Sequence, residues 1–70
     1  MRNIDGKHIV YAAKMRDGGY RVVEAVDWAD CKRHLGNAAL SIKERLVDLP
    51  KLHEIQHDED ARRALYEART

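Results

Sequence analysis

Two stretches in the first third of the chain alternate in the way that a β-strand does. The first runs from His8 to Met15 and the second from Tyr20 to Val26. Side chains two residues apart in a strand share a face, and both stretches place apolar residues at that spacing. Between them, Asp17-Gly18-Gly19 tolerates the positive φ angles of a tight turn. The pattern predicts an antiparallel β-hairpin over residues 8–27.

The length of the turn decides which side chains of this hairpin share a face. A two-residue loop, centred on either Asp17-Gly18 or Gly18-Gly19, puts Tyr20, Val22 and Val26 on the core face. Their neighbours there are Ile9, Tyr11, Ala13 and Met15. The opposite face is also apolar, with Val10, Ala12, Val23 and Ala25. We expect a helix or a third strand to cover it, and a partner-binding surface is the alternative.

After Asp27 the apolar residues follow a helical period. Asp27 fits an N-cap, and residues 28–35 fit either a short helix or a loop that ends before Gly36. From Asn37 to Leu49, apolar residues recur at i, i+3, i+7 and i+10, which predicts the main helix of the fold. These residues are Ala39, Ile42, Leu46 and Leu49.

Pro50 ends the predicted main helix and also fits the first turn of a following one. Acidic residues from Asp58 suit the start of a C-terminal helix, continuous with the preceding residues or broken near His57. Because only Leu65, Tyr66 and three alanines give this helix apolar surface, it either docks loosely or is completed by another chain. The sequence thus predicts one α+β domain over residues 1–70. An antiparallel hairpin or short meander (8–27) packs on one main helix, and a helical part (28–69) includes the C-terminal helix.

Composition narrows the class of protein. The 70 residues include 13 Lys and Arg, 12 Asp and Glu, and a single Cys, which excludes an internal disulfide. A chain of this size buries only about 60% of its unfolded surface, so a deep catalytic cleft would take up much of the core. No catalytic motif is present, and we expect no enzymatic activity. With a polar N-terminus and no run of about 18 apolar residues, a cytosolic protein without a membrane span is expected.

Basic residues gather around the predicted hairpin tip. Lys14, Arg16 and Arg21 converge there in either two-residue register, and Lys32 and Arg33 follow in the next element. Like charges across a strand pair cost stability, so a bound phosphate or nucleic acid would stabilise such a tip. Solvated side chains are the simpler explanation, because the total charge is close to neutral. A small nucleic-acid-binding regulator is therefore one alternative function.

Four potential metal ligands occur in two pairs: Cys31 with His34, and His53 with His57. His53 and His57 are four residues apart, so they would share one helical face, and a tetrahedral zinc site needs four such ligands. The absence of a second cysteine argues against a structural site. A zinc-stabilised adaptor is the second alternative, and otherwise no metal or cofactor is expected.

Residues 11–46 contain, in this order, Tyr11, Gly19-Tyr20, Val22, Val26-Asp27, Cys31, Gly36 and an Ala/Leu-rich segment. In this order they resemble the N-terminal fold of HicB-type antitoxins. Val26 stands where that family has a proline, and Asn37-Ala38 where it has Asp-Thr. Residues 50–70 are too short for the family's DNA-binding tail. The resemblance implies an alanine-rich helix after Gly36 and a module that docks on a toxin and neutralises it.

The leading interpretation is a non-enzymatic regulatory or inhibitory module that blocks a surface of a larger protein. Antitoxins and small phage-encoded inhibitors, including anti-CRISPR proteins, act in this way. A homodimer is compatible with the same apolar surfaces. Aromatic and arginine side chains contribute most to such interfaces. The predicted partner-binding residues are Arg16, Tyr20, Arg21, Trp28 and Tyr66.

Overall fold

Strand β2 (Lys7–Met15) is the centre of the fold, because every other described strand pairs with it. The computed structural model describes residues 3–4 and 7–68. The other strands are β1 (Asn3–Ile4), β3 (Tyr20–Val23) and β4 (Ala39–Val47). The helices are α1 (Trp28–Leu35), α2 (Leu49–His57) and α3 (Glu59–Glu67), with a 3-10 turn, η1 (Gly36–Ala38), before β4. The expected α+β class and its antiparallel hairpin are confirmed.

The register places β4 alone on one edge of β2. His8 pairs with both β1 and β4, and Tyr11 pairs with both β3 and β4. A strand residue has one neighbour on each edge, so β1 and β3 share the edge opposite β4. Since β3 and β4 are both antiparallel to β2, they run parallel to each other with β2 between them. The chain therefore crosses from one edge to the other through α1, and the sheet is not a simple meander.

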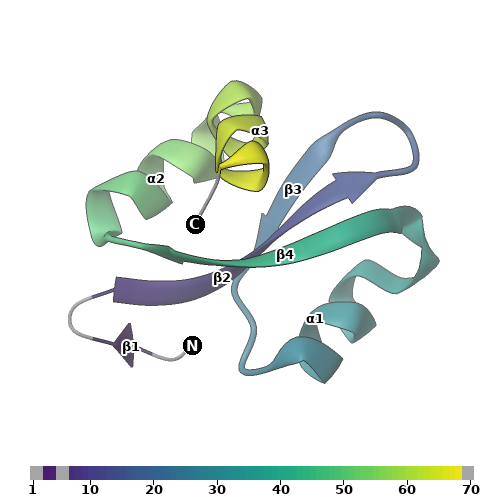
Figure 1. Cartoon of the computed structure of the whole chain (residues 1–70), viewed down its shortest axis with the longest axis horizontal. Coiled ribbons are helices and arrows are strands. Elements are labelled where there is room, and N and C mark those ends of the chain that lie inside the picture. The colour runs from purple at the N-terminus through teal and green to yellow at the C-terminus, as the bar shows by residue number, and fades with distance from the viewer. Residues whose placement is uncertain (1–2, 5–6, 69–70) are drawn as a thin grey trace.

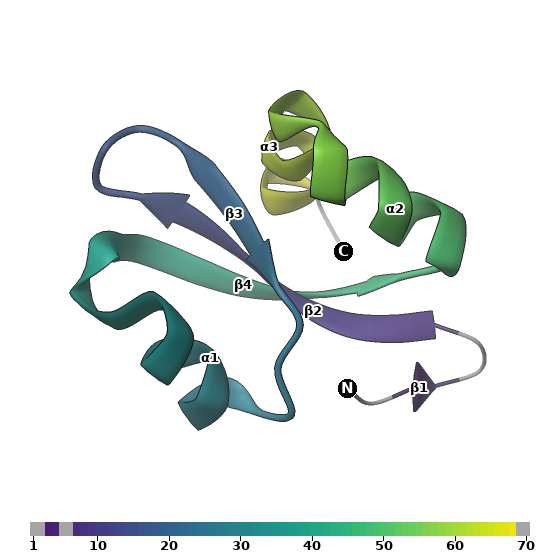
Figure 2. The same ribbon diagram turned by 180° about the vertical axis from the view of Figure 1, so that it is seen from behind.

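Helices cover both faces of the sheet: α1 lies on one, and α2 and α3 lie on the other (Figures 1 and 2). We call these the α1 face and the helix-pair face. Alternate residues of β2 divide between them. The α1 face buries Ile9, Tyr11, Ala13 and Met15 with Ala25, Cys31 and Leu35. The helix-pair face buries Val10 and Ala12 with Val47, Leu52, Ile55, Ala61 and Leu65. The expected cover over Val10 and Ala12 is confirmed, and that surface is not free for a partner.

The hairpin closes with a three-residue loop, one residue longer than the loop that the predicted strand faces assume. The Met15 N–H donates to the Gly19 carbonyl at 2.8 Å, which leaves residues 16–18 in the loop. Gly18 has φ +92°, a conformation that side chains with a Cβ rarely adopt. A glycine in this conformation suits the last position of a three-residue loop, in which a type I turn is followed by a bulge.

The extra loop residue reverses the predicted faces of β3. Ala12 pairs with Val22 and Lys14 pairs with Tyr20, so Tyr20 and Val22 lie on the helix-pair face. Val23 packs instead against the core of the α1 face. The strand ends at Val23, before Val26, which is exposed. A shift of one residue moves every side chain of a strand to the other face, which is why the turn length mattered.

Residues 39–47 form strand β4, so the main helix predicted over Asn37–Leu49 is wrong. The strand pairs with β2 from His8 to Met15, with a register shift after Lys14. Without this strand, one edge of β2 would leave its backbone N–H and C=O groups buried without partners. The backbone hydrogen bonds between this segment and β2 stabilise a strand more than the helical spacing of the apolar residues would stabilise a helix. The alanine-rich helix implied after Gly36 is likewise a strand here.

Each helix begins at an aspartate that caps its first turn. The side chains of Asp27, Asp48 and Asp58 accept backbone N–H groups at 2.8–3.0 Å at the start of α1, α2 and α3. Residues 28–35 are thus a helix, with Asp27 as its predicted cap. Pro50 lies in the first turn of α2, as expected, and the two C-terminal helices are separate, with a break at Asp58.

Two arginines hold α3 against the rest of the fold. Arg45 of β4 donates to the carbonyls of Leu65, Tyr66 and Ala68 at 2.8–3.1 Å, at the end of α3. Arg62 of α3 donates to the Tyr20 carbonyl at 3.0 Å and to the Ile55 carbonyl at 2.8 Å. These bonds compensate for the small apolar face of α3, so it docks within its own chain.

Candidate functional site

The predicted partner-binding aromatics lie on opposite faces of the sheet. The rings of Tyr20 and Tyr66 pack against each other on the helix-pair face, with centroids 5.5 Å apart. Trp28, at the start of α1, packs edge-on against Tyr11 of the α1 face at 5.9 Å. Tyr20 and Tyr66 are half-buried, whereas 49% of Trp28 is exposed. Of the three, Trp28 is therefore the one best placed to contact another protein.

The two predicted partner-binding arginines are exposed but do not extend either aromatic pair. Arg21 pairs with Ala13 and so belongs to the α1 face, at the edge formed by β3. Arg16 lies in the hairpin loop, where its Nε donates to the Asn37 carbonyl at 2.6 Å and ties the loop to η1. The five predicted residues do not form one continuous surface.

The basic residues of the nucleic-acid hypothesis are also dispersed. Lys14 lies opposite Tyr20 on the helix-pair face, and Arg21 lies on the α1 face. Lys32 and Arg33 are on α1, where Arg33 pairs with Asp30 at 3.1 Å. With Arg16 bonded to η1, the five cations share no single patch.

The sheet separates the two pairs of potential metal ligands. Cys31 and His34 belong to α1, and His53 and His57 belong to α2 on the other face. Within residues 3–4 and 7–68, no three His, Cys, Asp or Glu residues are grouped so that they could hold a metal ion. The four residues of the zinc hypothesis are therefore not brought together.

Cys31 is a core residue with a protected thiol. Its side chain is fully buried, and this burial raises the pKa of the thiol, with a smaller upward contribution from Asp30 and an opposing one from Lys32. The neutral thiol is thus favoured in the folded state. The protonated thiol therefore contributes to the stability of the fold. This contribution is complete at pH values below the pKa of the thiol in the unfolded chain, and it is lost as the pH rises through the pKa of the thiol in the folded protein.

We expect Cys31 of the native protein to react with a thiol reagent at about pH 8 only at the rate of unfolding. The measurement is the labelling rate with increasing urea, compared with the fully denatured chain as control. Labelling of the native protein as fast as the denatured chain would show that the thiol is accessible.

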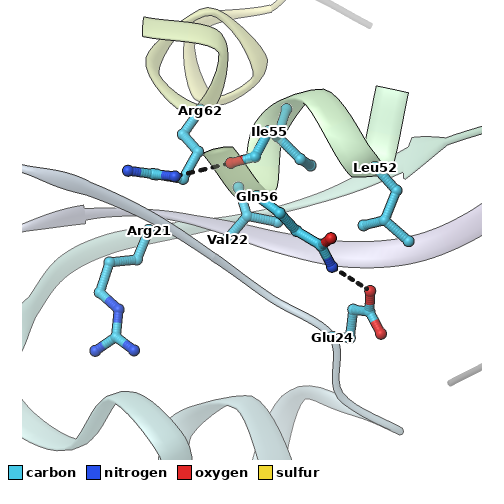
Figure 3. A pocket seen from close by; sticks show the side chains of 7 residues that line it. All are labelled: Arg21, Val22, Glu24, Leu52, Ile55, Gln56 and Arg62. Carbon is cyan, nitrogen blue, oxygen red and sulfur yellow. Dashed lines mark hydrogen bonds between the residues drawn. The ribbon is translucent and has the colours of Figure 1, made fainter. Parts of the chain in front are cut away.

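A surface pocket of about 390 Å³ lies between β3, α2 and α3 (Figure 3). Its polar groups are mostly bonded to the protein itself: Arg62 holds backbone carbonyls, and Gln56 donates to Glu24 at 3.5 Å. Arg21 lines the pocket but points away from the two helices. Its lining residues include no nucleophile beside a base.

The most distinctive surface runs along β4, whose outer edge pairs with no described strand. Leu40 and Leu46 of this strand are each 54% exposed, and Ile42 is half-buried. Leu46 pairs with Ile9 on the α1 face, and Ile9 is two residues along β2 from Tyr11, which Trp28 contacts. We call Leu40, Ile42, Glu44, Leu46 and Trp28 the β4 edge surface.

Sequence reasoning found only Trp28 of the β4 edge surface. The helical spacing predicts that Leu46 and Ile42 are both buried, whereas Leu46 is 54% exposed and Ile42 is half-buried. The signal that was present is the charged run Lys43-Glu44-Arg45 between apolar residues, which is typical of an edge strand.

Comparisons with family models, curated proteins and solved structures found no match to this chain. Among the described residues, no helix is long and apolar enough to cross a membrane. The resemblance to HicB-type antitoxins therefore stays a prediction.

Proposed function

We propose that this chain is a non-enzymatic protein-binding module that regulates or inhibits a larger protein by occupying part of its surface. The observation that carries the proposal is the edge of β4 that pairs with no described strand, with Leu40 and Leu46 about half-exposed near its two ends and Trp28 exposed at the start of α1. An unpaired strand edge is a template for pairing with another chain, and an exposed tryptophan contributes strongly to binding.

The proposal includes how the chain acts, which is by covering a surface of its partner. Antitoxins and phage-encoded inhibitors of the anti-CRISPR type act by covering a partner's surface, and a chain of 70 residues can do so without a catalytic site. A cytosolic location is part of the proposal, since the buried free thiol Cys31 needs no oxidising compartment. The dispersed cations give no specific support to nucleic-acid binding. The experiment described next therefore also detects adducts with nucleic acid.

Site-specific photo-crosslinking in cells that produce the protein tests this proposal. We expect a photoreactive residue at Leu46 to yield one discrete protein adduct, and one at Ala64, exposed on α3, to yield none. Trp28→Ala is expected to lower the Leu46 adduct about tenfold or more, after circular dichroism confirms that the variant is folded. Adducts with nucleic acid, or equal adducts from both positions, would contradict the proposal.

A further inference from the structure

The backbone hydrogen bonds of β2 show which groups of β4 face outward. The Met15 N–H donates to Gly19 on the β3 side, and the next N–H, that of Arg16, donates to Ala38 on the β4 side, both at 2.8 Å. Successive residues of a strand point their backbone groups to opposite edges. Even-numbered residues of β2 therefore bond to β4, and odd-numbered ones bond to β3.

The same alternation fixes the outer edge of β4. Ser41, Lys43, Arg45 and Val47 pair with even-numbered residues of β2 and point their backbone groups inward. Ile42, Glu44 and Leu46 consequently point their N–H and C=O groups outward. Among the described residues, the one hydrogen bond to these six groups comes from the Arg45 Nη1, which donates to the Glu44 carbonyl at 3.2 Å. The edge can therefore accept another strand.

The charges of β4 disfavour a second copy of the chain as that strand. Antiparallel pairing of two identical strands places the residue at the two-fold axis opposite itself. Pairings centred on Lys43, Glu44 or Arg45 each oppose two like charges, which is destabilising. Edge strands use such charges to prevent self-pairing.

From this edge we infer that the chain binds an extended segment of a partner protein as an added antiparallel strand on β4. The inference rests on the proposed function and names its site and partner. Added strands are held by main-chain hydrogen bonds, and the side chains beside the edge select the sequence. Antiparallel addition is the more stable arrangement per residue.

The side chains of β4 define the sequence of the partner strand. Ile42 and Leu46 lie on the α1 face and favour apolar residues opposite them, while the exposed Glu44 between them favours a basic one. On the helix-pair face, Lys43 favours an acidic residue, and Arg45 is already bonded to the carbonyls of α3. The partner segment therefore reads, in chain direction, apolar, any residue, basic, acidic, apolar.

Two labelled peptides of identical composition test the inference. One reads Thr-Val-Thr-Lys-Glu-Val-Thr and fits the edge, and the other exchanges its Lys and Glu. We expect fluorescence anisotropy to show that the first peptide binds about fivefold or more tightly, since two attractive pairs replace two repulsive ones. The double variant Lys43→Glu with Glu44→Lys is expected to reverse this preference.

A proline at position 44 separates main-chain from side-chain contacts. The Glu44 N–H points outward, so Glu44→Pro removes a donor from the free edge without breaking the pairing with β2. We expect this variant to lose binding of both peptides while Glu44→Ala retains binding of the first, with folding checked by circular dichroism.

Three outcomes would overturn the inference: equal affinity for both peptides, no binding at millimolar peptide, or a dimer of the chain that occupies the edge, detected by sedimentation. If the peptides fail while the Leu46 crosslink forms, the chain binds protein by other contacts and the proposed function stands. If the Leu46 crosslink fails, the proposed function itself is wrong.

Discussion

Replacing Ile55 with alanine is expected to lower the free energy of unfolding by about 2–5 kcal/mol. The Ile55 side chain is fully buried in the core of the helix-pair face, with Val10 and Ala12 of β2. A chain of this length has a total stability of only about 3.5–10 kcal/mol at about 0.05–0.15 kcal/mol per residue. The variant should therefore lose a large part of its total stability at 25 °C, as measured by urea denaturation followed by circular dichroism.

Leu49→Ala is the matched control for this experiment. Leu49 begins the same helix but is 50% exposed, so the loss of its side chain should cost about 1 kcal/mol or less. Comparable losses from both variants would mean that Ile55 is not in a packed core, and the assignment of α2 to the sheet would be wrong.

Arg45→Met is expected to lower the free energy of unfolding by about 2–3 kcal/mol and to loosen α3 before the rest of the fold. Arg45 donates to three carbonyls at the end of α3, where helical i+4 N–H donors run out; of the three, the Leu65 carbonyl also accepts the Ala68 N–H at 3.3 Å. Its positive charge also complements the negative end of the helix dipole. Methionine keeps much of the side-chain volume but supplies neither donors nor charge.

Urea denaturation gives the global effect of Arg45→Met, and hydrogen exchange of the α3 amides gives the local one. The control is Arg63→Met, since Arg63 is exposed and pairs only with Glu67, at 3.5 Å, among the described residues. That surface ion pair contributes about 0.5 kcal/mol or less. Equal effects of the two variants would show that Arg45 does not hold α3 in solution.

The hairpin and the C-terminal helix could be predicted from the sequence because their signals are local. Alternating residues on both sides of Asp17-Gly18-Gly19 require only neighbouring positions to be read together. The loop length could not be predicted in the same way. A glycine at Gly18 fits both a two-residue and a three-residue loop, and the choice depends on which face of β3 packs under α3.

Strand β4 was missed because its alternation is hidden by two cations. On the helix-pair face, Lys43 lies 4.6 Å from the centroid of the Tyr66 ring, and Arg45 bonds to the end of α3. Their partners are twenty or more residues away in sequence. Read locally, Lys43 and Arg45 look solvent-facing, and the remaining apolar residues have the spacing of a helix.

The candidate site was missed for the same reason. Trp28 could be predicted as a contact residue from its type alone, but the exposure of Leu46 and Leu40 follows from their place on an edge strand. Only the pairing of β4 with β2 establishes which of their backbone groups are free. The unpaired edge results from the order of the strands in the sheet, so no short stretch of the sequence is enough to predict it.

The crossover from β3 through α1 to β4 has a consequence for how the protein folds as it is made. β2 ends at Met15, but the strand that completes its second edge ends at Val47, 32 residues later. At about 5–20 residues per second, a ribosome takes about 2–6 s to add those residues. During that interval the most apolar strand of the nascent chain has an uncovered edge and an uncovered face, and a chaperone that binds extended apolar segments would find its target there.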